Sequence, residues 1–284
     1  MTDSPAASAE VLAHQVDAEG DEPLLLLNGG MMSFAAWEPV AAPLRAVRAE
    51  GGGQRYRLIG CDFRGQLRSP GAAHEQLAAH AEDVAALLHH LDLGPVHVVG
   101  ASFGGLVGVE LAAAHPELVH SLVVATAAIR ADEAMDASTD RMITLIRNGL
   151  AGGDLGFVHD LMADQFFSAA WREEHAADLA ARRTQVAALP RWWFEGLLGI
   201  LAAVRSYDVS VAASRVRCPA LVVVAGGDEV MKPDSCRELA AALRAEAVEH
   251  PTAGHALIVE DPSWMAQAFV DLLQRALSLR EPSC

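Results

Sequence analysis

Short, uninterrupted apolar runs bounded by glycine, proline or aspartate recur along the chain and constrain its fold more than any other feature. Runs this short that are apolar throughout, rather than at alternate positions, are typical of strands covered on both faces, as in a parallel sheet. We expect such strands at 23–27, 57–61, 95–99, 122–125 and 221–225.

Segments with helical spacing separate most of these runs. The expected helices lie at 76–91, 106–115, 234–243 and 263–279. Asp234 and Ser263 are the expected N-caps of the last two helices, because short polar side chains favour that position. Residues 9–18 are expected to form a peripheral strand. This alternation predicts an α/β fold with a mostly parallel, doubly wound sheet.

The segment from about residue 130 to residue 213 breaks the alternation, because no buried strand is evident in it. It contains amphipathic stretches instead, at 142–150, 160–167 and 171–189. Three of the chain's five tryptophans, Trp171, Trp192 and Trp193, also fall there. We interpret the segment as a helical insertion that packs over the edge of the sheet.

Acidic residues outnumber basic ones, and this balance excludes two classes of partner. The chain has 21 Lys and Arg against 37 Asp and Glu, so its formal net charge is 21 − 37 = −16. Such a surface repels phosphate backbones and anionic membranes, so we expect no nucleic-acid partner and no membrane partner. The hydrophobic content of 52% is enough for a large buried core.

The N-terminal sequence and the cysteines indicate a cytoplasmic location. No signal-peptide pattern is evident, and no apolar run approaches the roughly 18 residues of a membrane span. The four cysteines, at 61, 218, 236 and 284, are too far apart in sequence for a C-x-x-C metal or redox pair. We therefore expect reduced thiols and no metal site.

The pattern G-x-S-x-G occurs at Gly100, Ser102 and Gly104. An apolar run precedes it and a small-residue helical segment follows it, which is the strand–turn–helix setting of a nucleophile elbow. In such a turn the positions two before and two after the serine must be small so that the chain segments can approach each other. The alternative is a Gly/Ser turn before an ordinary helix. We favour Ser102 as a nucleophile at the carboxyl end of its strand, where open α/β sheets bind ligands.

Together with this motif, several further segments resemble those of the α/β-hydrolase fold family, and the resemblance spans nearly the whole chain. The residues that carry it are 24–30, 62–65, 100–104, 226–228 and 254–255. The resemblance implies a catalytic triad of Ser102, Asp228 and His255, with no metal and no organic cofactor. It also implies that residues 130–213 form a helical cap after the sixth strand, with 1–129 and 214–284 as the core.

The acid and the base each have a competing interpretation. Asp228 follows an apolar run and a Gly-Gly turn, but Glu229 stands directly beside it. His255 lies among small residues just before the last expected helix, and the alternative is an exposed loop histidine. The resemblance places the acid directly after the Gly-Gly turn, which matches Asp228.

The resemblance also implies an oxyanion hole made of two backbone N–H groups. One belongs to Phe103, and the other to Gly30, with Met31 as the alternative. Asn28 stands where the family usually has histidine, and its side-chain amide is the candidate substitute. Leu67 stands where relatives commonly have glycine.

The segment 62–69 contains two pairs of residues with different expected roles. Asp62 and Arg64 are expected to be structural. Gln66 and Leu67 are candidates for the pocket wall.

The implied function is two-step acyl transfer on a small molecule, with hydrolysis of a carboxylic ester, thioester or lactone as the first choice. Apolar residues of the cap and of the first loop are the candidate substrate contacts: Met31, Met32, Phe166, Trp192 and Trp193. The alternative is that they form the core of the cap.

Three rival functions remain open. The first is a carbon–carbon bond hydrolase or enol-lactonase of aromatic catabolism, the second an acyltransferase, and the third a low-turnover ligand receptor. The exposed face of the cap is a candidate homodimer surface.

Overall fold

Seven strands form one sheet in the computed structural model, which describes residues 11–49 and 51–278. Their order across the sheet is β1-β3-β2-β4-β5-β6-β7. β1 runs antiparallel to β3, and all other neighbouring pairs are parallel, which confirms the predicted sheet type. The strands are β1 (His14–Val16), β2 (Glu22–Leu27), β3 (Tyr56–Cys61), β4 (Val96–Ala101), β5 (Val119–Ala125), β6 (Ala220–Ala225) and β7 (Glu246–His250).

Helices cover both faces of this sheet because successive residues of its inner strands point to opposite sides. In β2, Leu25 and Leu27 join one apolar cluster, whereas Leu24 and Leu26 join the other. Each such buried leucine contributes about 1.5–3 kcal/mol to folding. The helices of the first face are α2 (Leu77–His90), α3 (Phe103–Ala114), α9 (Ser210–Arg215) and α10 (Pro233–Leu243). Those of the second face are α1 (Glu38–Ala46), α11 (Leu257–Glu260) and α12 (Pro262–Ser278). Two short 3₁₀ helices, Phe34–Trp37 and Pro116–Leu118, join these elements.

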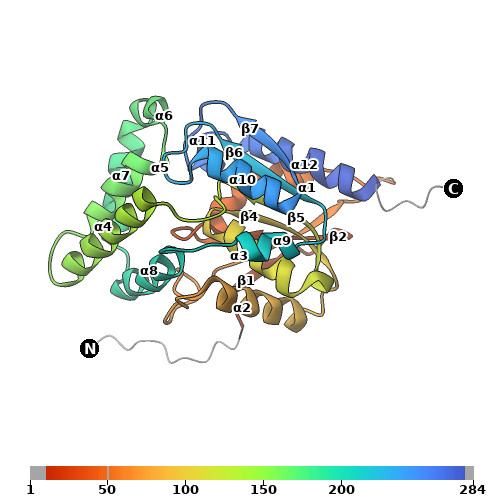
Figure 1. The fold of residues 1–284 in the computed structure, drawn as a ribbon, viewed down its shortest axis with the longest axis horizontal. Coiled ribbons are helices and arrows are strands. Elements are labelled where there is room, and N and C mark those ends of the chain that lie inside the picture. The colour runs from red at the N-terminus through yellow and green to blue at the C-terminus, as the bar shows by residue number, and fades with distance from the viewer. Residues whose placement is uncertain (1–10, 50, 279–284) are drawn as a thin grey trace.

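Five helices between β5 and α9 form a separate group at one end of the molecule, coloured yellow-green to teal in Figure 1. They are α4 (Glu133–Leu150), α5 (Gly156–Phe166), α6 (Ala169–Glu174), α7 (Ala176–Ala187) and α8 (Arg191–Val204), and we call them the cap. The insertion is helical, as the sequence predicts. The prediction places it after the sixth strand. In the described part of the chain it follows the fifth, because only one strand, β1, lies before β2. The predicted boundary at 213/214 falls inside α9, which packs against α3.

The structure differs from the sequence-based expectations at three elements. β7 was not expected, because it is a polar edge strand that contains Glu246, Glu249 and His250. The predicted N-caps are both wrong: Lys232 is the N-cap of α10, and Asp261 accepts a hydrogen bond from Trp264 N at the start of α12. In both cases a proline begins the helix one residue earlier than expected, since proline suits the first helical position. The peripheral strand expected at 9–18 is β1, and residues 9 and 10 lie outside the described part.

No single described helix combines the length and apolarity needed to cross a membrane. The pair α7 and α8 passes that test together, by length and composition only, across a bend of 102°.

Candidate active site

Ser102 lies in a sharp turn between β4 and α3, at the carboxyl edge of the sheet. Its backbone is in a strained conformation, with φ 51° and ψ −119°, and its N–H donates to the Ala125 carbonyl at 2.8 Å. A Cβ at Gly100 would lie 2.3 Å from the Gly104 carbonyl oxygen, and a Cβ at Gly104 would lie 2.3 Å from the Leu27 carbonyl oxygen. Only glycine fits at these two positions, so the spacing of the motif follows from the turn.

Ser102, His255 and Asp228 form a continuous hydrogen-bonded chain, although the loops that carry them are far apart in sequence. The His255 Nδ1 atom lies 2.8 Å from Asp228 Oδ2, and His255 Nε2 lies 2.9 Å from Ser102 Oγ. A carboxylate only accepts hydrogen bonds, so Nδ1–H donates to Asp228 and Nε2 is left to accept from the serine hydroxyl. His255 is 6% exposed and Asp228 is 2% exposed.

The loop after β6 selects Asp228 over its neighbour Glu229. The second oxygen of Asp228, Oδ1, accepts from the N–H groups of Val230 and Met231, both at 2.8 Å. These two bonds fix the carboxylate, so that Oδ2 faces the imidazole. Glu229 also lines the cavity described below, but its side chain is largely exposed and its carboxylate binds Lys232 Nζ at 2.6 Å rather than His255.

The loop after β2 is held by a buried side-chain network centred on Asn28. The Asn28 amide nitrogen donates to the Cys61 carbonyl at 2.8 Å, to Asp62 at 3.0 Å and to Gln66 at 3.1 Å. Its oxygen accepts from Trp37 Nε1 at 3.0 Å. The Asn28 amide therefore makes hydrogen bonds within this loop region, as expected of a residue that replaces the family's usual histidine.

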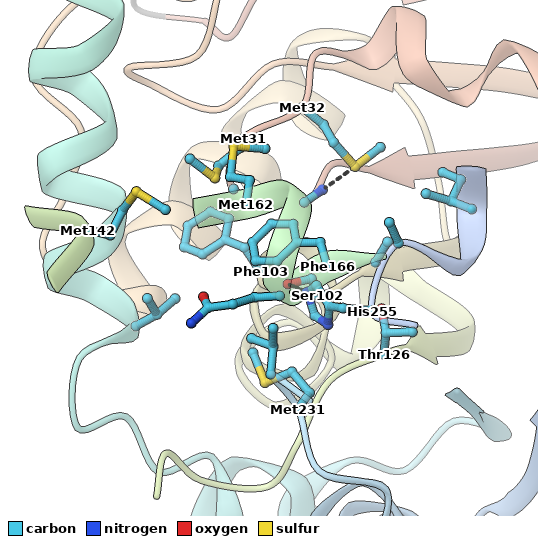
Figure 2. A pocket seen from close by; sticks show the side chains of 18 of the residues that line it. Met31, Met32, Ser102, Phe103, Thr126, Met142, Met162, Phe166, Met231 and His255 are labelled. Carbon is cyan, nitrogen blue, oxygen red and sulfur yellow. Dashed lines mark hydrogen bonds between the residues drawn. The ribbon is translucent and has the colours of Figure 1, made fainter. Parts of the chain in front are cut away.

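Gln66 extends this network to the two glycines of the loop. Its amide nitrogen donates to the carbonyls of Gly29 at 2.8 Å and Gly30 at 3.2 Å. The Gly29 N–H contacts the Met32 sulfur at 3.3 Å, as the dashed line in Figure 2 shows. No acceptor bonds the Gly30 N–H within the described residues. That N–H and the free N–H of Phe103, the first residue of α3, lie on adjacent segments, since a Cβ at Gly30 would be 3.7 Å from Phe103 Cβ.

The other residues of the 62–69 segment are also structural. Asp62 accepts from the Phe34 and Arg68 N–H groups and from Ser33, and Arg64 pairs with Asp83 at 2.6 Å. Both agree with the sequence-based expectation. Gln66 and Leu67 do not line the cavity described below: Gln66 is 1% exposed in the network, and Leu67 is 39% exposed.

Buried His80 supports Phe103 from behind. Its ring packs edge-on against the rings of Phe103 at 5.0 Å and Phe63 at 5.7 Å. Its Nε2–H donates to the His74 carbonyl at 2.9 Å, whereas its buried Nδ1 has no hydrogen-bond partner. Burial lowers the pKa of His80 from 6.5 to about 4, because a proton on Nδ1 would have neither water nor an acceptor.

Because the pKa of His80 is lowered in the folded state, we expect the free energy of unfolding to fall in mild acid. At pH values above 6.5 it is neutral in both states. Between pH 6.5 and about 4 the unfolded chain binds a proton that the folded chain does not, so up to about 3 kcal/mol of stability is lost as the pH falls. Urea unfolding at pH 7 and pH 4.5 measures this loss, and His80→Gln should make it smaller. An unchanged pH dependence in His80→Gln would contradict the assignment.

A cavity of about 590 Å³ opens in front of Ser102 and His255, between the core and the cap (Figure 2). It is lined by every methionine among the described residues, seven of the eight in the chain. They are Met31, Met32, Met135, Met142, Met162, Met231 and Met265. Methionine is flexible and polarisable, so such a wall can adapt to apolar groups of different shapes.

Three of the five predicted substrate contacts, Met31, Met32 and Phe166, line this cavity, and two do not. Trp193 is 5% exposed and packs against Phe194 within the cap, and Trp192 is half-buried against the same apolar cluster. The part of α8 that reaches the cavity begins one turn later, at Leu197. For the tryptophans, the alternative that they form the core of the cap therefore describes the structure.

The sequence-based reasoning missed the contribution of α4 to the cavity. Met135, Ser138, Thr139 and Met142 line it from one face of this helix. Their spacing of three and four residues was the available signal, because such positions share one helical face. Ser138 donates to Gln165 Oε1 at 2.7 Å, which adds a polar pair to the mostly apolar wall. Within residues 11–49 and 51–278 no group of three or more His, Cys, Asp or Glu side chains could hold a metal ion.

Comparison with known proteins agrees with this fold. The family model of the alpha/beta hydrolase fold matches residues 22–262. A relative from Pantoea ananatis, named "Putative carbamate hydrolase RutD", is 30% identical over 262 residues and covers 90% of each chain.

Solved structures include the enol-lactonase from Burkholderia xenovorans LB400, with a TM-score of 0.78 and 24% identity over 93% of this chain and 96% of that one. A hydrolase from Pseudomonas aeruginosa PA01 has a TM-score of 0.78 and 27% identity over 94% and 97% of the two chains. The family match covers most of the chain and includes all the loops that build the site. The chain therefore belongs to the α/β-hydrolase fold family and is a hydrolase.

Proposed function

We propose that the protein is a serine hydrolase that cleaves a carboxylic ester of a small apolar substrate through an acyl-enzyme. The observation that carries this proposal is the hydrogen-bonded chain from Ser102 through His255 to Asp228, with bonds of 2.9 and 2.8 Å, at the floor of an apolar cavity. A serine hydroxyl is a weak nucleophile, and such a chain supplies the base that activates it.

The proposed reaction follows from the hydrogen-bond directions in the series Ser102–His255–Asp228. Ser102 Oγ attacks the substrate carbonyl while His255 Nε2 takes its proton. Asp228 keeps the imidazole in the required tautomer and stabilises the imidazolium. The N–H groups of Phe103 and Gly30 stabilise the oxyanion, and His255 then protonates the leaving group. Water, activated by the same imidazole, releases the acid and restores Ser102.

The described cysteines do not compete for the role of nucleophile. Burial raises the pKa values of Cys61 and Cys236 well above their usual range and that of Cys218 to about 11. Thiols held neutral in this way react slowly with carbonyl carbon. None of the three lines the cavity.

A panel of 4-nitrophenyl substrates tests the proposed reaction. One leaving group is combined with acyl groups from acetyl to decanoyl and benzoyl, and with N-substituted carbamoyl groups, because the relatives are named as carbamate hydrolases. We expect turnover of apolar esters, with a higher kcat/KM for acyl groups that fill the cavity. Hydrolysis of the carbamates alone would replace esters by carbamates as the substrate class. No turnover of any substrate would contradict the proposal.

A further inference from the structure

The loop that carries His255 is held in place by the cap as well as by the core. Figure 1 shows the corner between α5 and α6 beside α11, the short helix that follows His255. The Ala256 N–H donates to the Phe166 carbonyl at 2.7 Å. The Phe166 ring lies 4.9 Å from the His255 ring, in an edge-to-face arrangement. The residue after the histidine is therefore bonded directly to the cap.

The carboxylate of Glu260, the last residue of α11, joins the same two segments. One oxygen accepts from the Ser168 N–H at 2.7 Å and from the Gly254 N–H at 3.1 Å. The other oxygen accepts from the Ser168 hydroxyl at 2.7 Å. Gly254 precedes His255, whereas Ser168 is the N-cap residue of α6 in the cap. One ionised side chain thus bonds the residue before the histidine to the corner of the cap.

The packing at Gly254 shows how close this contact is. A Cβ at this position would lie 2.7 Å from the Phe166 carbonyl oxygen, 2.8 Å from Ser168 N and 2.9 Å from Glu260 Oε1. The loop has no room to shift toward the cap. It is also prevented from shifting away, since hydrogen bonds to charged acceptors are among the stronger ones in proteins.

We infer that Glu260 is a positioning residue for the reaction proposed above: through Ser168 and Gly254 it holds the His255 loop against the cap, so that the imidazole reaches both Ser102 and Asp228. The inference rests on the proposed function. Glu260 is not among the residues that line the cavity, and its carboxylate bonds Ser168 and Gly254 rather than Ser102. Glu260 acts on the distances from the His255 imidazole to Ser102 and Asp228. A displacement of about 1 Å in a catalytic group can lower the rate roughly 100-fold.

The rate of Ser102 phosphonylation by a fluorophosphonate reports on this positioning without a known substrate. Glu260→Ala removes all three hydrogen bonds, and we expect the second-order labelling rate constant to fall about 10- to 100-fold. With an ester substrate, kcat should fall by a similar factor while KM changes little. Ser168→Ala removes the bond from the hydroxyl to Glu260 and the N-cap bond that the hydroxyl accepts from Trp171 N, but it keeps both N–H bonds to Glu260, so its effect should be smaller.

Two further variants separate positioning from a loss of stability. Glu260→Gln keeps one oxygen for the two N–H donors, and its amide can donate to the Ser168 hydroxyl, so it should restore most of the rate. Asp261→Ala is the matched control: it removes the hydrogen bond to Trp264 N and the contact with His250 Nε2 at 3.6 Å, but no bond to the cap or to Gly254, so it should lower Tm and leave labelling as in the wild type.

Each outcome of this experiment decides the question. Slow labelling in Glu260→Ala, with recovery in Glu260→Gln, supports the inference. It is overturned if Glu260→Ala labels at the wild-type rate, or if Asp261→Ala slows labelling as much for the same change in Tm. If Glu260→Ala does not fold, the comparison of Ser168→Ala with Asp261→Ala decides by the same criterion. Absence of labelling in the wild type would instead remove the proposed function, and the inference with it.

Discussion

Replacement of Ser102 by alanine is expected to lower kcat for the best ester substrate by about a millionfold, the scale seen when a serine nucleophile is removed from such a triad. The reason is that no other group in the described cavity joins a hydroxyl to a histidine. The fold should persist, because alanine keeps the backbone of the turn and removes only the bond to His255. Steady-state kinetics and thermal unfolding measure both effects.

Ser214→Ala is the control for this substitution. Ser214 is exposed on α9, and among the described residues its hydroxyl bonds only the Val211 carbonyl. We expect wild-type kinetics from this variant. If Ser102→Ala kept more than a small fraction of wild-type kcat in preparations free of contaminating esterase, another nucleophile would be at work.

Replacement of Asp228 by asparagine is expected to lower kcat by about 10⁴-fold. The amide keeps an oxygen for the Val230 and Met231 N–H groups, so the loop should remain in place. Its nitrogen then faces His255 Nδ1 and can only donate to it, which forces the imidazole into the tautomer that cannot accept the Ser102 proton. Single-turnover kinetics would show the loss in the acylation step.

Glu229→Gln distinguishes the two neighbouring carboxylates. Glu229 is bonded to Lys232 at the surface and not to His255, so its substitution should have a small effect by comparison. A larger loss of kcat in Glu229→Gln than in Asp228→Asn would reverse the assignment of the acid.

The sheet could be predicted from sequence wherever burial leaves a one-dimensional signature. Strands β2 to β6 are covered on both faces, so each contains a mostly apolar run, and the expected runs fall on them. β7 lies at the edge of the sheet, and its charged, partly exposed residues give it a sequence that resembles a loop. The starts of α10 and α12 are predicted one residue too late. In each case a short polar residue is the expected N-cap, whereas the helix begins at the proline before it, Pro233 or Pro262.

The three hydrogen-bonded residues of the site could be predicted because each occupies a loop of restricted composition. Ser102 needs two glycines, for which the close backbone approaches at Gly100 and Gly104 give the reason. The cavity wall could not be predicted in the same way. Apolar residues of the cap face either its own core or the substrate, and only the direction of α8 decides that Leu197 reaches the cavity while Trp193 does not.

Mass spectrometry of the fluorophosphonate-treated protein tests the central claim most directly. The account predicts one adduct per chain, located by peptide mapping on Ser102, and no adduct in Ser102→Ala. A single adduct on any other residue, or an unchanged adduct in Ser102→Ala, would contradict it.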